Sequence, residues 1–203
     1  MFDALITAPT HSTPWPWAQV DDVIPQYYTL APHFEALCEV DRTSNTLDNT
    51  IYTQENGRMQ DPVLVDWLAD AQQWLDAHIE QVLAPWPQHR RFPAYKGEVQ
   101  ITRQAPAPYR FPVHDESRDK CWSAVIYCAP QHSTGTTLYH NIKGTGVQPS
   151  TAITMDKRWG TAPWRCNSAF IFAGKDSVTW HDYEGIIDQH RITVNLFIKR
   201  NNK

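Results

Sequence analysis

The sequence predicts a mainly β protein with a helical N-terminal part, whose core is a jelly roll with a long helix packed on the outer sheet face. Two observations lead to this fold class. From Lys96 onward the apolar residues alternate with a period of two in short segments, which is typical of strands. Before Lys96, one long segment repeats its apolar residues at helical spacing. A helical N-terminal part followed by several short strands favours a double-sheet jelly roll.

The length of 203 residues is sufficient for one domain with a sizeable core. We expect a single domain over residues 1–203, in which residues 1–95 form a helical extension that supports the core and residues 96–198 form the core. The formal net charge of −4 leaves no basic excess, which disfavours a dedicated nucleic-acid-binding protein.

Three features of the chain predict a soluble, cytoplasmic protein that neither spans nor binds a membrane. No apolar run approaches the ~20 residues of a membrane-spanning helix. The N-terminal segment has neither the basic nor the apolar region of a signal peptide. The 4 cysteines show no Cys-x-x-Cys spacing, which fits a reducing compartment.

The N-terminal part contains one well-marked helix. Several prolines in residues 9–25 predict an extended or irregular segment, which a short helix over 32–40 follows. The polar stretch 41–60 predicts a loop with one short strand. Asp61 is a good N-cap, and Pro62 suits the first helical position. Apolar residues then recur at steps of three and four, which predicts a helix of about six turns that ends before Pro85.

The core is expected to contain eight strands, at residues 97–103, 108–114, 121–128, 135–141, 151–155, 167–173, 177–181 and 189–198. Side chains alternate between the two faces of a strand, so the last strand has an aliphatic face and a second face that carries Arg191. The aliphatic face can cover the long helix, and Arg191 then points into the barrel. A buried arginine is costly unless it meets an anion. Arg191 therefore pairs with a protein carboxylate or binds the carboxylate of a ligand.

A candidate metal site comes from three residues at strand ends. His114 and Glu116 are two positions apart in an extended chain, so both side chains project to the same side, and Asp115 points away. His181 follows much later, ten residues before Arg191. Two imidazoles and one carboxylate form the facial triad that binds non-haem Fe(II). If a bulge reverses the alternation, Asp115 is the carboxylate ligand in place of Glu116.

These residues resemble the pattern of the Fe(II)/2-oxoglutarate-dependent oxygenases with a double-stranded β-helix (cupin-like jelly roll) core. That pattern is His-x-Asp/Glu, a distal His, and an Arg about ten residues later with Ser or Thr two positions beyond. This chain has His-Asp-Glu at 114–116, Trp-His-Asp at 180–182 and Arg-Ile-Thr at 191–193. The stretch HDESRDKCWSAVIYCAP, followed by GTTLYH, is similar to the small viral and bacterial members of the prolyl-4-hydroxylase-like branch. The resemblance covers residues 96–198.

The resemblance implies roles for seven residues. Three would ligate iron: His114, Glu116 and His181. Arg191 would bind the distal carboxylate of 2-oxoglutarate with its planar fork, and Thr193 would hydrogen-bond the same group. Two residues on one face of the strand 121–128 would line the cosubstrate pocket: Ser123 and Tyr127. No catalytic residue beyond the metal ligands is implied, and the carboxylate is Glu rather than the commoner Asp.

The implied reaction is hydroxylation of a substrate by O2, coupled to conversion of 2-oxoglutarate to succinate and CO2. The primary substrate stays open between a free amino acid, a protein side chain and a nucleotide. In this family the residues beyond the core select the substrate, and here those are the unmatched residues 1–95 and the insertion 142–166. The alternative is a jelly roll without oxygenase chemistry, either a cupin-like metal or ligand-binding module or a structural protein, because fold alone does not separate these classes.

Overall fold

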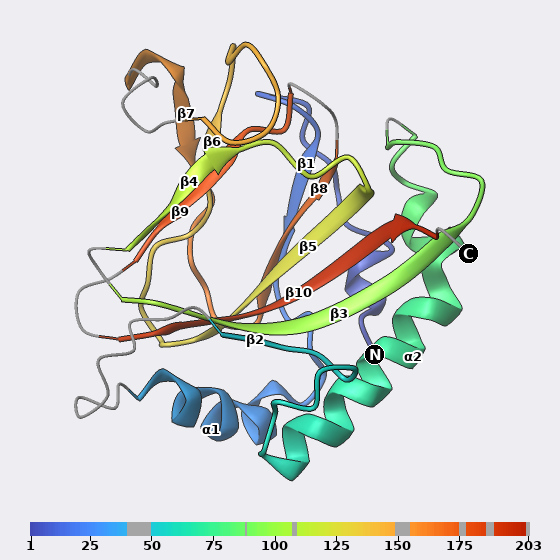
Figure 1. The fold of residues 1–203 in the computed structure, drawn as a ribbon, viewed down its shortest axis with the longest axis vertical. Coiled ribbons are helices and arrows are strands. Elements are labelled where there is room, and N and C mark those ends of the chain that lie inside the picture. The colour runs from blue at the N-terminus through green and yellow to red at the C-terminus, as the bar shows by residue number, and fades with distance from the viewer. Residues whose placement is uncertain are drawn as a thin grey trace.

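The computed structural model describes residues 1–39, 50–87, 89–106, 109–148, 155–174, 178–185 and 189–201. Within these ranges the chain is mostly β, with two antiparallel sheets and two α-helices, as Figure 1 shows. None of the described helices is long and apolar enough to cross a membrane.

The larger sheet has six strands. In spatial order they are β1 (Trp17–Val20), β8 (Ser168–Ala173), β5 (Lys120–Ala129), β10 (Arg191–Arg200), β3 (Tyr95–Gln104) and β2 (Thr50–Tyr52). The smaller sheet has four strands, in the order β4 (Arg110–His114), β9 (His181–Glu184), β6 (Thr137–Tyr139) and β7 (Arg158–Thr161). The helices are α1 (Tyr27–Cys38) and α2 (Pro62–Leu83), with short 3₁₀ turns at Asp3–Leu5 and Met155–Lys157.

The predicted helix after Asp61 is confirmed. The Asp61 carboxylate accepts hydrogen bonds from the N–H groups of Val63 at 2.9 Å and Leu64 at 3.3 Å, which satisfies the free donors at the start of α2. Figure 1 shows α2 running beside β3. Side chains of α2 hydrogen-bond this strand: Gln72 Oε1 accepts from the Val99 N–H at 2.9 Å, and Asp76 Oδ1 accepts from the Gly97 N–H at 3.0 Å.

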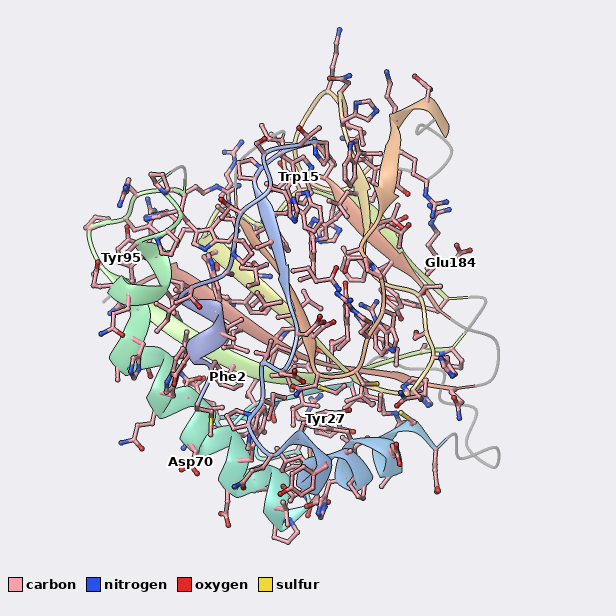
Figure 2. All side chains as sticks on the ribbon, turned by 180° about the vertical axis from the view of Figure 1, so that it is seen from behind. Phe2, Trp15, Tyr27, Asp70, Tyr95 and Glu184 are labelled. Atoms are coloured by element: carbon pink, nitrogen blue, oxygen red, sulfur yellow. The ribbon has the colours of Figure 1, made fainter. Side chains whose placement is uncertain are left out.

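The main core lies between the helices and the six-stranded sheet. It includes the four aliphatic residues of β10, which are Ile192, Val194, Leu196 and Ile198, so the predicted alternation of that strand is confirmed. Phe2 is fully buried in the same core and packs edge-on against the Trp67 and Trp74 rings of α2. Figure 2 shows Phe2 beside this helix. The opposite face of β10 is therefore free to line a polar cavity.

The N-terminal segment is more ordered than its prolines predict. Residues 17–20 form β1, which pairs with β8 at the edge of the sheet. An edge strand needs hydrogen bonds on one side only, so prolines beside it are tolerated. The first helix begins at Tyr27 rather than at Pro32, which lies inside α1. The stretch 41–60 contains β2, and its first part, 41–49, lies outside the described residues.

Two strand predictions differ from the structure. The predicted strand 177–181 is misplaced: residue 177 lies outside the described residues, residues 178–180 are not in a strand, and β9 runs from His181 to Glu184. The predicted strand 151–155 falls mostly outside the described residues, and its last residue belongs to a 3₁₀ turn. The unpredicted β7 lies within the segment 142–166; its side chains are mostly exposed, so no alternation of apolar residues marks it.

Candidate metal and carboxylate site

Side chains from both sheets line an open cavity of about 280 Å³. Four of the predicted site residues line it: His114, Glu116, His181 and Arg191. They come from β4, the loop after it, β9 and β10, so segments far apart in the sequence meet here. The structure therefore brings the predicted metal ligands and the predicted carboxylate-binding arginine to one cavity.

The two histidines lie opposite each other in the smaller sheet. His114 ends β4, His181 begins β9, and the two residues are paired in the register of these strands. The centroids of their imidazole rings are 4.2 Å apart. His114 Nδ1 lies 3.0 Å from the Pro112 carbonyl, and His181 Nδ1 lies 2.8 Å from the Thr179 carbonyl. With the proton on Nδ1, each ring donates to that carbonyl and keeps the lone pair of Nε2 for a metal ion.

Burial keeps both imidazoles neutral. Desolvation, together with the neighbouring imidazole of His114, lowers the pKa of His181 to about 3. Burial also lowers the pKa of His114 from its ordinary value. Metal ligation requires the neutral imidazole, so both side chains are in the binding form at neutral pH.

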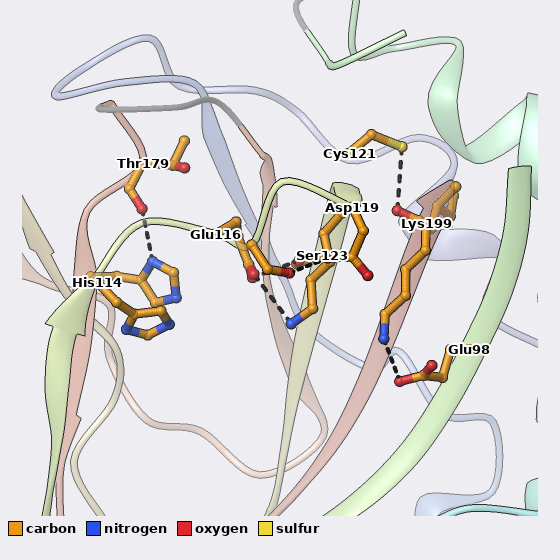
Figure 3. Close-up of polar contacts among 12 residues, drawn as sticks. Glu98, His114, Glu116, Asp119, Cys121, Ser123, Thr179 and Lys199 are labelled. Carbon is orange, nitrogen blue, oxygen red and sulfur yellow. Dashed lines mark hydrogen bonds and ion pairs between the residues drawn. The ribbon is translucent and has the colours of Figure 1, made fainter. Parts of the chain in front are cut away.

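Glu116 is the buried carboxylate of the site, and its side chain is 5 % exposed. Oε1 accepts a hydrogen bond from the Ser123 hydroxyl at 2.8 Å, and Oε2 lies 3.2 Å from Nζ of Lys120. Burial favours the neutral acid, but Lys120, the two imidazoles and Ser123 outweigh it and lower the pKa of Glu116 to about 2. Figure 3 shows Glu116 between His114 and Ser123, with its dashed contacts on the side away from His114.

In the described parts of the chain, no three His, Cys, Asp or Glu side chains form a group that could hold a metal ion in the present geometry. The alternative ligand, Asp115, accepts a hydrogen bond from the Gly146 N–H at 2.6 Å and lines an adjoining cavity of about 480 Å³. The strand pairing is irregular between Phe111 and His114, before the first ligand, so the irregularity does not reverse the side chains after it. Glu116 therefore shares the cavity of the two imidazoles, and Asp115 does not line it.

Arg191 is buried without an acidic partner among the described residues. It is 2 % exposed, and neither Nε nor Nη1 has a hydrogen-bond partner there. Its guanidinium carbon lies 4.0 Å from the ring centroid of Tyr183, 5.1 Å from that of Trp164 and 5.4 Å from that of Tyr127. Burial lowers the pKa of Arg191, and among the described residues Tyr127 and Tyr183 oppose this shift. Of the two expected partners, the ligand carboxylate is therefore the one that the described residues favour.

The other three predicted site residues are buried near the cavity but do not line it. Ser123 is fully buried against Glu116. Tyr127 donates a hydrogen bond to Thr136 Oγ1 at 2.9 Å and presents its ring to Arg191. Thr193 is fully buried, and its hydroxyl has no partner in the described ranges. None of the three is a lining residue, so a contact of these side chains with a cosubstrate stays a prediction.

Sequence reasoning missed several residues of the cavity: Gln104, Lys120, Thr136, Tyr183 and Asn195. Asn195 was within reach, because it lies on the same face of β10 as Arg191. Lys120 carried a weaker signal as a charged residue at the start of a buried strand. Tyr183 lies two positions after His181 on β9 and so shares its face. Gln104 and Thr136 carry no local signal, because only the packing of distant segments places them beside the cavity.

Compared with known proteins, the chain matches no family model and no curated protein. Solved structures resemble it. A prolyl-4-hydroxylase from Pseudomonas putida is 16% identical, with a TM-score of 0.54 over 98% of this chain and 97% of that one. A prolyl hydroxylase from Trichoplax adhaerens, solved with a peptide fragment of the hypoxia inducible factor oxygen degradation domain, is 10% identical, with a TM-score of 0.56 over 90% and 83%. This chain shares their fold.

A further similar structure is the viral collagen prolyl hydroxylase from Paramecium Bursaria Chlorella virus-1, solved as a 2OG complex. It is 11% identical and covers 92% of this chain and 96% of that one, with a TM-score of 0.49. We draw no conclusion from this third structure, because its TM-score is below 0.5. The two structures above establish the jelly-roll fold, and at their low identity they establish no activity for this chain.

Proposed function

We propose that the chain is a non-haem Fe(II)- and 2-oxoglutarate-dependent dioxygenase, which hydroxylates a substrate and releases succinate and CO2. The observation that carries the proposal is Arg191. Its buried guanidinium has no acidic partner among the described residues and lines the same cavity as His114 and His181. A buried charge without a counter-charge is strongly unfavourable, so this position fits an anionic ligand.

The residues of the cavity fit both Fe(II) and 2-oxoglutarate, which this function requires. The donor set of two neutral imidazoles and one ionised carboxylate suits Fe(II), which His114, His181 and Glu116 would hold. The orphaned Arg191 Nε and Nη1 atoms suit the distal carboxylate of 2-oxoglutarate, and the free hydroxyl of Thr193 suits the same group. When bound, the iron would supply O2 activation coupled to decarboxylation of 2-oxoglutarate.

The surrounding side chains would bind and orient the cosubstrate. Tyr183 and Trp164 keep water away from the guanidinium, which strengthens its attraction for a carboxylate in the cavity. Tyr127 also stacks against Trp164, at 4.7 Å between ring centroids, and so fixes the rings that enclose Arg191. An arginine whose position is fixed before binding loses less entropy when the ligand enters.

The substrate is proposed as a class: a free amino acid, a protein side chain or a nucleotide. The aligned Trichoplax enzyme was solved with a peptide fragment, so a peptide side chain is the first class to test. We propose that residues 1–95, with α2 against the outer face of the sheet, support a catalytic core at 96–198 within one domain. A cytoplasmic location is proposed from the cysteine pattern alone.

One observation favours a second candidate function, a cupin-like module that binds a carboxylate ligand without metal chemistry. Both oxygens of Glu116 are already engaged, by Ser123 and Lys120. In that case Arg191 would bind a dicarboxylate in the absence of metal, and no succinate would form.

An anaerobic titration with Fe(II) and then 2-oxoglutarate tests the proposal. We expect the visible charge-transfer band of iron-bound 2-oxoglutarate, its loss in His181→Ala and its weakening in Arg191→Ala. His78→Ala is the control, because His78 lies on α2 and stacks on Trp74, outside the cavity. A protein that shows no band and retains no metal, but binds 2-oxoglutarate, is the binding module instead. Admission of O2 should then release succinate only from the metal-loaded protein.

A further inference from the structure

Lys120 lies between the candidate metal site and the adjoining cavity. It is the first residue of β5, four positions after Glu116, and it lines both cavities. Its Nζ lies 3.2 Å from Glu116 Oε2 and 3.6 Å from the ring centroid of Phe197, and its side chain is 20% exposed. The ammonium group is thus held by a carboxylate and by an aromatic face, which attracts a cation.

A second lysine has nearly the same surroundings. Lys199 pairs with Lys120 across β5 and β10, and its Nζ lies 5.4 Å from the same Phe197 ring. It forms an ion pair with Glu98 at 2.8 Å, and its side chain is 15% exposed. The two lysines differ in one respect that matters here. The carboxylate partner of Lys120 lines the cavity of the two imidazoles, and Glu98 does not.

We propose that Lys120 is a positioning residue that competes with the metal ion for Glu116. This inference rests on the proposed function, in which Glu116 is a metal ligand. The Lys120 ammonium occupies Oε2 and neutralises the buried carboxylate, which otherwise would be an uncompensated buried charge. A divalent ion that binds His114 and His181 draws on the same carboxylate charge as this ammonium, so the two cations compete for Glu116.

Two physical consequences follow for metal affinity. The ion weakens the Lys120–Glu116 pair, and the ammonium group on the Phe197 ring stays close to a second cation. Both effects weaken metal binding. In return, the carboxylate is kept ionised and ordered by Ser123 and Lys120 before the ion arrives. Lys120 therefore lowers the affinity of the site while it maintains the structure of the ligand.

Metal titration of matched variants tests this inference. Lys120→Met removes the charge and keeps an unbranched apolar stem on Phe197. We expect it to bind Mn(II) about tenfold more tightly than the wild type, the factor that a difference of ~1.4 kcal/mol produces. Loss of the electron paramagnetic resonance signal of free Mn(II) measures the affinity. Lys120→Arg keeps the charge and should retain the wild-type affinity, and Lys199→Met should stay within about twofold of it.

A second measurement separates competition from a general loss of structure. In chelator, Lys120→Met should unfold at a lower urea concentration than the wild type, because Glu116 loses its counter-charge. Mn(II) should stabilise Lys120→Met more than it stabilises the wild type. The visible d–d absorption of Co(II) should likewise saturate at a lower metal concentration in this variant.

The outcomes distinguish the two proposals. If the wild type binds Mn(II) and His181→Ala does not, while Lys120→Met binds no better than Lys199→Met, the competition by Lys120 is overturned and the metal site stands. If no variant and no wild-type protein binds Mn(II) or Co(II), both the metal site and the role of Lys120 are rejected.

Discussion

At the scale of single residues, Arg191 combines a function with an energetic penalty. It is buried, and its Nε and Nη1 atoms have no partner in the described part of the chain, while three aromatic rings surround its guanidinium. Cation–π contacts recover part of the lost hydration, but an unpaired buried charge still destabilises a fold. Replacing Arg191 should therefore change the stability of the fold and the binding of an anionic ligand in opposite directions.

Arg191→Met should therefore stabilise the protein while abolishing ligand binding. We expect the free energy of unfolding in urea to rise by about 1–3 kcal/mol without 2-oxoglutarate, because the desolvated charge is gone. The affinity for 2-oxoglutarate, measured by calorimetry, should fall at least ~100-fold, since a charged hydrogen-bonded pair is lost. Arg191→Lys keeps the charge without the planar fork and should bind with intermediate affinity. A clear loss of stability in Arg191→Met would mean that a part of the protein balances this charge.

His181 should make the fold sensitive to acid. Its pKa is lowered to about 3 in the folded chain by burial and by His114, against 6.5 for the ordinary group. The unfolded chain therefore binds more protons between these values, so the contribution of His181 is complete above about pH 6.5 and is lost as the pH falls toward 3. Each such proton gives a slope of about 1.4 kcal/mol per pH unit.

Urea unfolding in chelator from pH 7 to pH 5 measures this slope. The range avoids Glu116, whose contribution is lost only below its ordinary value of 4.5. We expect the wild type to lose stability on acidification. The slope of stability against pH should be smaller in His181→Gln by the equivalent of close to one bound proton. Equal slopes in the two proteins would show that His181 is protonated in the fold.

At the scale of elements, Gly135 allows the backbone just before β6 to approach the backbone just after β7 closely. A Cβ atom at Gly135 would lie 1.7 Å from the Ala162 carbonyl oxygen, and the Ala162 N–H donates to the Thr136 carbonyl at 2.8 Å. Thr136 in turn lines the cavity and accepts the hydrogen bond of Tyr127. The backbone contact at Gly135 therefore positions a wall of the candidate site.

Gly135→Ala should lower the free energy of unfolding by about 1–3 kcal/mol, because the methyl group has no space beside a backbone carbonyl. It should also weaken 2-oxoglutarate binding through Thr136 and Tyr127. Gly160→Ala in β7 is the matched control, since a Cβ there meets nothing within 4 Å. Chemical denaturation of the two variants gives the comparison, and equal stabilities would contradict the expected clash.

At the scale of the whole molecule, one hydrophobic core joins α1, α2 and the six-stranded sheet. The face of β10 opposite the cavity belongs to this core, so the helices support the strand that carries Arg191. The prediction of a single domain implies that damage to α2 reaches the whole fold. Two parts that fold independently would instead unfold in separate transitions.

Leu75→Ala should lower the free energy of unfolding by about 2–5 kcal/mol, because Leu75 is fully buried in α2. Far-ultraviolet circular dichroism and tryptophan fluorescence should report the same single transition. Val65→Ala on the same helix, where Val65 is 43% exposed, should change stability by at most ~0.5 kcal/mol. Two separate transitions would show that residues 1–95 and the core fold independently.

Features encoded in one continuous segment are predictable from the sequence. Helix α2 was predicted because Asp61, Pro62 and the apolar periodicity lie in one continuous segment. The two faces of β10 were predicted because alternation is a property of one strand. The spacing of His114, Glu116 and His181 also indicated a shared site, and all three line one cavity.

The partners that these residues meet depend on how distant segments pack together. Edge strand β1 and the exposed β7 carry no apolar alternation, so their pairing depends on neighbours distant in sequence. The contact of Tyr183 and Trp164 with Arg191 depends on how separate strands and loops are brought together. The engagement of Glu116 by Lys120 rather than by the imidazoles depends on competing charges within a few ångströms. Such competition is a property of three-dimensional distances, which no linear pattern records.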